Sequence, residues 1–275
     1  MNRRKVILAV APVAHMEKTI PSGIKNPVKP EDIAQQTIDC AQAGASLVHL
    51  HVRDVDGTQI GDLDVFSHTI DLIRKESPIL IQGSTGGKSN LSLELRSVSV
   101  DEPRVQMASL NMGSTNFGDG VYINTWDDIR YWAQKMKENQ VIPELEVFDL
   151  SMIEAIKKLK EEGTLEDPLH FNFSLGFKGA LSATASNLQA LIQAVGPHEN
   201  WSLLHEGMED FSLIGVAIGS GASAVRVGYE DGFYKAKGEP ATNVELVKHA
   251  VALIRAMGCE VATIEEARSM LGILR

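Results

Sequence analysis

Short apolar runs of strand length recur along the whole chain and alternate with longer amphipathic segments. In those segments apolar positions repeat every three or four residues, which is typical of helices. An unbroken order of strand, helix, strand and helix favours a parallel sheet. The apolar runs cover residues 5–13, 45–53, 78–82, 104–110, 141–148, 169–175, 201–205 and 222–227.

The segments between the runs carry helix signals. Residues 30–44 open with Pro-Glu-Asp and end at a glycine, as helices commonly do. Thr263 and Glu266 have the spacing of a capping box and predict a last helix. Helical spacing also relates the apolar positions within residues 66–73, 153–159, 188–195 and 244–254.

About eight strand–helix units are the number found in a closed β/α barrel. The sequence therefore predicts an α/β protein folded as a single (β/α)8 TIM barrel, with a doubly wound open sheet as the main alternative. One barrel fills the 275 residues of the chain. No linker, repeat or low-complexity tract marks a boundary, so we expect one domain over residues 1–275.

The composition limits the kinds of binding partner and the cellular compartment that we expect for this protein. The chain has 26 basic and 36 acidic residues, and a net charge of −10 repels a phosphate backbone, which argues against nucleic acid. Cys40 and Cys259 cannot build a disulfide framework and fit a reducing compartment. The apolar run from Val6 to Ala14 is too short to cross a bilayer, and Pro12 interrupts it. We expect a soluble cytoplasmic protein with no membrane partner.

Histidines at the end of the second run predict a metal site. His49, His51 and Arg53 alternate along a strand, so they share one face, which in a barrel points into the lumen. Glu230 ends the last run, and the first and last strands of a closed barrel are neighbours. Two histidines, one glutamate and an open water position form a known catalytic zinc set. Two hydrogen-bonded histidines, and a Glu230 paired with Arg226, are the alternative interpretation.

A glycine-rich turn follows the third run. Residues 82–89 resemble a phosphate loop, but Gln82 stands where that pattern requires glycine, so nucleotide hydrolysis is not supported. Residues 84–87, Ser-Thr-Gly-Gly, would still offer free backbone N–H groups and hydroxyls to a carboxylate or thioester oxygen. A plain glycine turn is the alternative.

Two glutamates occupy one face of the fifth run. A buried pair formed by Glu144 and Glu146 would raise one carboxyl pKa and could supply an acid or a base. The alternative is that these carboxylates pair with a lumen arginine, Arg53 or Arg226. The spacing alone does not decide between the two.

Taken together, the motifs resemble those of the β-keto acid cleavage enzymes, a family exemplified by cleavage of 3-keto-5-aminohexanoate. The resemblance covers nearly the whole chain and is highly specific. It rests on residues 43–53 around Val-His-Leu-His-Val-Arg, 82–87, 108–111, 116–119 (Asn-Phe-Gly-Asp), 143–146 (Pro-Glu-Leu-Glu) and 226–231.

The resemblance implies a TIM barrel, usually tetrameric, with one zinc ion per chain and acetyl-CoA as co-substrate. A β-keto acid and acetyl-CoA would give acetoacetate and a new acyl-CoA by Claisen and retro-Claisen chemistry. By resemblance, Asp231 matches the general base, Arg226 its partner and Glu146 an acidic residue of the site. His49, His51 and Glu230 match the zinc ligands, and Ser84, Gly87 and Ser109, with Asn111 of the same motif, match substrate-binding positions.

A further expectation concerns the end of the substrate opposite its keto acid group. Some family members carry a glutamate after the first strand that contacts an amino group; an ungapped match places Met16 there, and a one-residue slip places Glu17 there. An acidic mouth with few basic partners, Arg53 and Arg226, would favour a β-keto acid bearing an amino or quaternary ammonium group. A pocket for a neutral tail is the alternative. The acids counted at the mouth are Glu17, Glu144, Glu146, Glu206 and Asp231.

Two other functions remain open at this point. A metal-dependent barrel hydrolase or aldolase-type lyase could use the same ligands, although such hydrolases usually carry the histidine pair on strand one. A non-catalytic metal or small-molecule binding protein is the other. The presence of both Asp231 and Arg226 argues against it.

Overall fold

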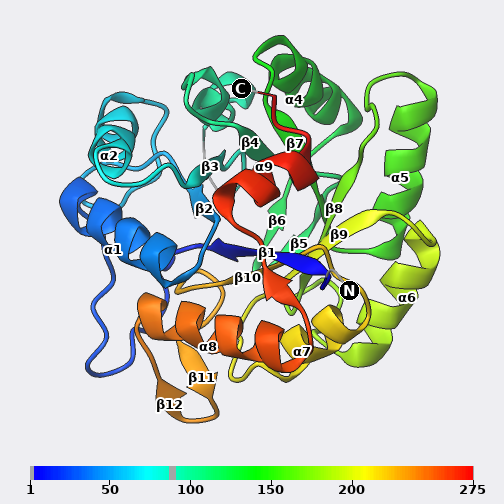
Figure 1. Cartoon of the computed structure of the whole chain (residues 1–275). Helices are drawn as coiled ribbons and strands as arrows, with labels where there is room; N and C mark the ends of the chain where they lie inside the picture. The colour runs from blue at the N-terminus through cyan, green and yellow to red at the C-terminus, as the bar shows by residue number, and fades with distance from the viewer. Residues whose placement is uncertain (1–2, 87–90, 275) are drawn as a thin grey trace.

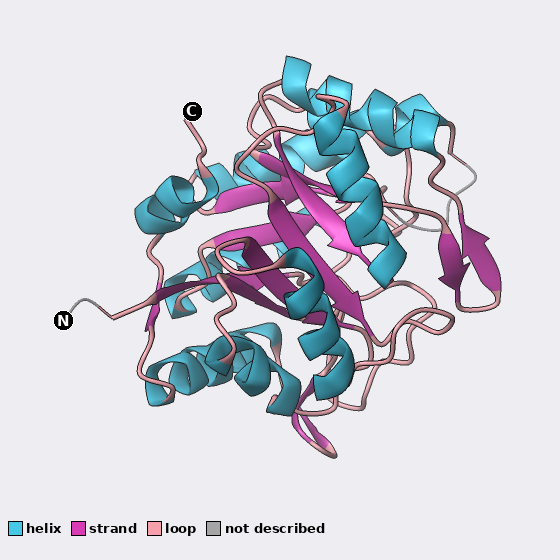
Figure 2. Cartoon of the chain, turned by 90° about the vertical axis from the view of Figure 1, so that its right-hand side faces the viewer, coloured by secondary structure: helices cyan, strands magenta, loops and turns pink. Residues whose placement is uncertain are grey.

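The computed structural model describes residues 3–86 and 91–274, and its centre is a closed parallel barrel (Figures 1 and 2). β1 pairs with both β2 and β10, which closes the sheet and excludes the open doubly wound alternative. The predicted (β/α)8 fold is therefore confirmed. The barrel strands are β1 (Lys5–Val10), β2 (Leu47–Leu50), β3 (Leu80–Gly83), β4 (Met107–Asn111), β7 (Ile142–Val147), β8 (His170–Leu175), β9 (Asn200–His205) and β10 (Ala224–Val227).

Helices surround the strands, as both views of the whole chain show. Local signals set several boundaries: Pro30 begins α1, and Thr263 and Glu266 form the predicted capping box of α9. The segment after β3 differs, with two single short turns, α3 (Leu93–Arg96) and η1 (Val98–Asp101), in place of a long helix. The other helices are α1 (Pro30–Ala43), α2 (Asp64–Arg74), α4 (Trp126–Glu138), α5 (Leu150–Glu161), α6 (Ala185–Val195), α7 (Ser212–Gly219), α8 (Asn243–Ala256) and α9 (Ile264–Leu271).

Short additional strands lie at the edge of the barrel or outside it. β13 (Glu260–Val261) pairs with the start of β1. Two antiparallel hairpins lie outside the barrel, β5 (Thr115–Phe117) with β6 (Gly120–Tyr122), and β11 (Tyr234–Ala236) with β12 (Glu239–Pro240). Across residues 3–86 and 91–274, none of the helices has the length and apolar character that a membrane span requires.

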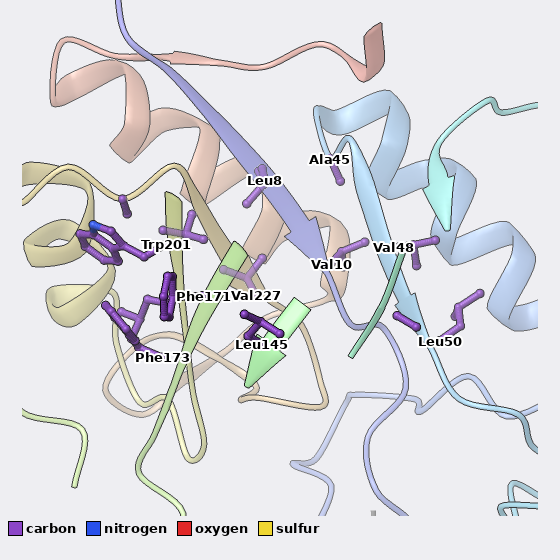
Figure 3. Packing of buried hydrophobic residues seen from close by; sticks show 14 of the residues in the cluster. Leu8, Val10, Ala45, Val48, Leu50, Leu145, Phe171, Phe173, Trp201 and Val227 are labelled. Atoms are coloured by element: carbon purple, nitrogen blue, oxygen red, sulfur yellow. The ribbon is translucent and has the colours of Figure 1, made fainter. Parts of the chain in front are cut away.

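Each barrel strand separates an apolar outer face from an inner face whose character changes along the barrel. Outer-face side chains such as Leu8, Val48 and Leu145 pack in the main core beneath the helices (Figure 3). At the N-terminal end of the lumen an apolar layer packs on α9, which closes this end of the barrel; its members include Ile7, Leu47, Leu80, Met107 and Leu271.

Above that apolar layer the lumen is polar. Gln82, Glu144, Asn172 and Ser202 are all buried there and hydrogen bonded to one another. Since buried polar groups need such partners, this layer supports the C-terminal end of the barrel, where the predicted site residues gather.

Candidate active site

A cavity of about 330 Å³ opens at the C-terminal ends of the barrel strands. Ser109 and Asn111 are buried but are not part of its wall, and Gly87 lies outside the described residues. A larger hollow of about 880 Å³ beside α4 and α5 contains none of the predicted site residues. The cavity wall includes the predicted residues Glu17, His49, His51, Ser84, Glu146, Arg226, Glu230 and Asp231.

The three predicted metal ligands come together in this cavity. Nε2 of His49 lies 3.7 Å from Glu230 Oε1, and Nε2 of His51 lies 3.4 Å from Glu230 Oε2. One potential ligand atom from each residue lies within 4.8 Å of the other two. Two imidazole nitrogens and one carboxylate oxygen at this spacing fit a divalent cation such as zinc, with room for a further ligand on the cavity side.

The electrostatics also suit a cation. Burial lowers the pKa of His49 to about 3 and lowers that of His51, so both rings are neutral and have lone pairs to donate. Burial acts to raise the pKa of Glu230, but the positive charge of the neighbouring Arg226 lowers it well below its usual value. The set therefore offers two neutral donors and one anionic donor.

A glycine turn places Glu230 across the first strand. Gly228 follows β10 with φ +132°, and a Cβ there would lie 2.3 Å from the carbonyl oxygen of Ala11. Only glycine tolerates both the conformation and this close approach. The N–H of Glu230 then donates to Ala11 O over 3.2 Å, which fixes the turn against the end of β1 and directs Glu230 toward His49 of β2 and His51 just after it.

Arg226 and Asp231 form a buried bidentate ion pair. Arg226 donates from Nε to Asp231 Oδ2 over 2.9 Å and from Nη2 to Oδ1 over 2.6 Å. Nη2 also reaches Glu230 Oε1 at 3.2 Å. Although burial disfavours its charge, Asp231 and Glu230 raise the pKa of Arg226, so it remains a cation. Asp231 is thereby held on the cavity wall directly beside the metal-ligand set.

The two lumen glutamates differ in their surroundings. Glu144 accepts a hydrogen bond from Gln82 Nε2 at 2.8 Å, and no ion pair joins it to an arginine among the described residues. Burial raises the pKa of Glu144 and raises that of Glu146 to about 8, against the opposing charge of Arg226. The carboxyl pKa values are thus raised, as the sequence predicted for a buried glutamate pair, and loss of solvation is the main cause.

The raised pKa of Glu146 predicts that the stability of the metal-free protein depends on pH. Native Glu146 keeps its proton up to about pH 8, whereas the unfolded chain loses it near the ordinary value of 4.5, so the free energy of unfolding falls as pH rises between those values. Glu146→Gln should gain stability relative to wild type as pH rises through this window, measured by urea unfolding. The exposed Glu154→Gln is the matched control, and parallel curves for all three proteins would contradict the assignment.

In the described part of the glycine-rich turn, residues 84–86, the backbone N–H groups are not free as the sequence suggested. The N–H of Ser84 donates to Leu50 O, that of Thr85 to Ser109 Oγ, and that of Gly86 to Ser84 Oγ. Thr85 Oγ1 also donates to Ser109 O at 2.6 Å. These groups are therefore occupied within the protein, and Ser109 supports the turn from below the cavity.

The charge balance at the mouth also differs from expectation. Lys18 pairs with Glu206 at 2.9 Å and contacts the carbonyl oxygen of Glu230, which leaves Glu206 no longer an unpaired acid. Glu144 lies beneath the cavity rather than on its wall. The acidic excess is therefore smaller than counted from the sequence, because the position of Lys18 in its loop could not be predicted from the sequence alone.

The two candidate positions in the loop after β1 have different surroundings. Glu17 lines the cavity, and its side chain forms no ion pair with another described residue. Met16 instead lies over Gly57, with its sulfur 2.6 Å from the position a Cβ would take there. Of the two positions, Glu17 is therefore the one on the cavity wall.

Sequence reasoning missed an aromatic wall on one side of the cavity. The rings of Phe117 and Phe177 stack with centroids 4.9 Å apart, and Phe148 lies 5.0 Å from Phe177. Tyr122 completes the group from β6, 5.7 Å from Phe117. Phe148 is the first residue after β7 and Phe177 the second after β8, so their position just beyond a strand end was the available signal.

Comparison with known proteins now bears on these features. The family model described as "beta-keto acid cleavage enzyme" matches residues 5–273. The chain belongs to this family. The predicted family membership and the prediction of an enzyme are thereby confirmed.

Two curated relatives and one solved structure illustrate the similarity. The 3-keto-5-aminohexanoate cleavage enzyme of Acetoanaerobium sticklandii is 38% identical over 97% of this chain and 98% of its own. The 3-oxoadipate:acetyl-CoA acetyltransferase of Cupriavidus necator is 34% identical over 93% and 92%. The structure of apo ObcA matches with a TM-score of 0.77 and 21% identity, over 90% of this chain and 65% of that chain, a likeness that shows the fold alone.

Proposed function

We propose that this protein is a zinc-dependent β-keto acid cleavage enzyme that uses acetyl-CoA and releases acetoacetate and a new acyl-CoA. The observation that carries the proposal is the position of Asp231, held by Arg226 on the wall of a cavity next to the carboxylate of Glu230. A base beside a metal-ligand set is an arrangement that suits removal of a proton next to a carbonyl group.

The residues divide the first step between them. His49, His51 and Glu230 would hold zinc, which when bound polarises the keto acid's carbonyl and so acidifies the carbon between its two carbonyl groups. Asp231 takes the proton from that carbon. Arg226 contacts both oxygens of Asp231 and so orients the carboxylate toward the cavity.

The remaining steps exchange one carbon–carbon bond for another. The carbanion attacks the thioester carbonyl of acetyl-CoA, forming a new carbon–carbon bond and releasing the CoA thiolate. The thiolate then adds to the original β-carbonyl, and the old carbon–carbon bond breaks to give the new acyl-CoA. The acetoacetate carbanion takes its proton back from Asp231, which regenerates the base without a redox cofactor.

We further propose that the β-keto acid carries an amino group. Glu17 lines the cavity without an ion-pair partner among the described residues, so we expect its carboxylate to meet a cation on the substrate. The relative from Acetoanaerobium sticklandii, named for an amino-bearing substrate, supports the same choice. A carboxylate at this position disfavours a second carboxylate on the substrate.

The substrate proposal predicts the effect of Glu17→Gln. The variant should lose about tenfold in kcat/KM for 3-keto-5-aminohexanoate, the equivalent of about 1.4 kcal/mol, and should change little toward an aliphatic β-keto acid of similar length. Glu209→Gln, an exposed glutamate outside the cavity, is the matched control. A higher specificity of the wild type for 3-oxoadipate or the aliphatic acid would overturn the charge argument and leave the cleavage reaction standing.

The reaction itself is tested by mixing the purified protein with acetyl-CoA and a panel of β-keto acids. Acetoacetate and a new CoA thioester should appear in equal amounts, and only when both reactants are present. Release of free acetate would indicate a hydrolase, and cleavage without acetyl-CoA would indicate a lyase. A homo-tetramer in the cytoplasm is our further expectation, which size-exclusion chromatography with light scattering tests for the assembly.

A further inference from the structure

Hydrogen bonds connect the metal-site histidine His49 to a carboxylate deeper in the lumen. Nδ1 of His49 lies 2.7 Å from Oε1 of Gln82, and Nε2 of Gln82 donates to Oε2 of Glu144 over 2.8 Å. The three residues come from β2, β3 and β7. They are 2%, 1% and 7% exposed, so each polar group depends on protein partners rather than on water.

Glu144 is held from its other side as well. Ser202 Oγ lies 3.3 Å from Glu144 Oε1, and Asn172 Nδ2 donates to Ser202 Oγ over 2.8 Å. Ser174 Oγ in turn donates to Asn172 Oδ1 over 2.8 Å. These bonds fix the carboxylate between three strands of the polar lumen layer, and the reaction steps above make no use of it.

The order of donors and acceptors in this relay sets the tautomer of His49. A carboxylate can only accept hydrogen bonds, so Gln82 must turn its NH2 group toward Glu144 and its oxygen toward His49. An amide oxygen also only accepts, so Nδ1 of His49 must carry the ring proton. The lone pair is then on Nε2, the atom that faces Glu230 at 3.7 Å.

We propose that Glu144, acting through Gln82, is a positioning residue that fixes His49 in the tautomer whose Nε2 can bind a metal. The expected effect on metal affinity rests on the proposed metal function, whereas the tautomer of His49 does not depend on it. It gives a role to Gln82, the residue that breaks the phosphate-loop pattern. His51 provides a contrast, because its buried Nδ1 finds no hydrogen-bond partner in the described part of the chain.

Two variants separate this role from simple packing. Glu144→Leu removes the acceptor, so the amide of Gln82 is free to turn and offer its NH2 group to His49, which places the ring proton on Nε2. The double variant Q82E/E144Q exchanges the two side chains. The carboxylate at position 82 then only accepts, from His49 Nδ1 and from the new amide at position 144, so the native tautomer returns.

The test observes the tautomer directly in metal-free protein. Long-range ¹H–¹⁵N correlations of ¹⁵N-histidine-labelled protein near neutral pH should show His49 protonated at Nδ1 in the wild type and in Q82E/E144Q. Glu144→Leu should lose that form, with His51 unchanged. In a chelator competition, Zn²⁺ should bind Glu144→Leu about 10–100-fold more weakly, and the double variant should recover most of that loss.

Several outcomes would overturn the proposal. Retention of the Nδ1-protonated form in Glu144→Leu would do so, as would a folded double variant that fails to restore it. If circular dichroism shows that Glu144→Leu does not fold, Gln82→Met replaces it, since it removes the acceptor at Nδ1 itself. If the tautomers are as predicted but none of the proteins binds Zn²⁺, the proposed metal function is refuted and the relay remains supported.

Discussion

Asp231→Asn is expected to lower kcat by about a thousandfold, while the protein still folds and retains its metal. The amide cannot accept the proton that the carboxylate removes from the keto acid. The structure adds a second effect: Arg226 donates to both oxygens of Asp231, so the asparagine NH2 group must face one arginine donor. We therefore expect a loss of about 1–3 kcal/mol in stability as well.

Steady-state rates, metal content and urea unfolding of the same Asp231→Asn sample separate these effects. Asp210→Asn, an exposed aspartate outside the cavity, is the matched control. A near-normal rate in Asp231→Asn would mean that the base lies elsewhere, with Glu146 the next candidate because its raised pKa also suits proton transfer.

Removal of a metal ligand should have the other large effect. His49→Ala and Glu230→Ala each remove one of the three donors and leave a set that cannot enclose a cation, so metal content should fall from one ion per chain toward zero. The loss should exceed the roughly 10–100-fold effect typical of an outer hydrogen-bond partner. Elemental analysis after dialysis measures the stoichiometry directly.

His68→Ala, a half-exposed histidine of α2, is the matched control for these ligand variants. Its metal content should equal that of the wild type. Unchanged stoichiometry in both His49→Ala and Glu230→Ala would refute the ligand assignment, whichever metal is found. Wild-type affinity should also decrease at acidic pH, since protonated imidazoles cannot bind a cation.

The barrel could be predicted because its signals are local. Each strand buries an apolar outer face, and each intervening segment carries helical periodicity, so both patterns are visible in short windows. The pairing of His49 with His51 could be predicted for the same reason, since alternation along a strand places both on one face. Glu230 followed from closure of the barrel, which brings the end of β10 next to β1.

Other parts of the site depend on contacts between distant segments. The register that sets His49 beside Gln82 on β2 and β3 cannot be deduced from either strand alone. Loop paths decide that Lys18 neutralises Glu206, which reduced the acidic mouth expected from the sequence. The turn at Ser84 appeared rich in free N–H groups, because nothing local reveals that Ser109 occupies one of them.

Isotope tracing follows the acetyl group through the proposed reaction. With acetyl-CoA labelled by ¹³C at both acetyl carbons and an unlabelled β-keto acid, we expect acetoacetate labelled at C3 and C4 only, together with an unlabelled new acyl-CoA. That pattern follows because the acetyl group of acetyl-CoA joins the two carboxyl-end carbons of the keto acid, while the rest of the keto acid moves to CoA. Label in free acetate, or label retained in the CoA thioester formed, would contradict it.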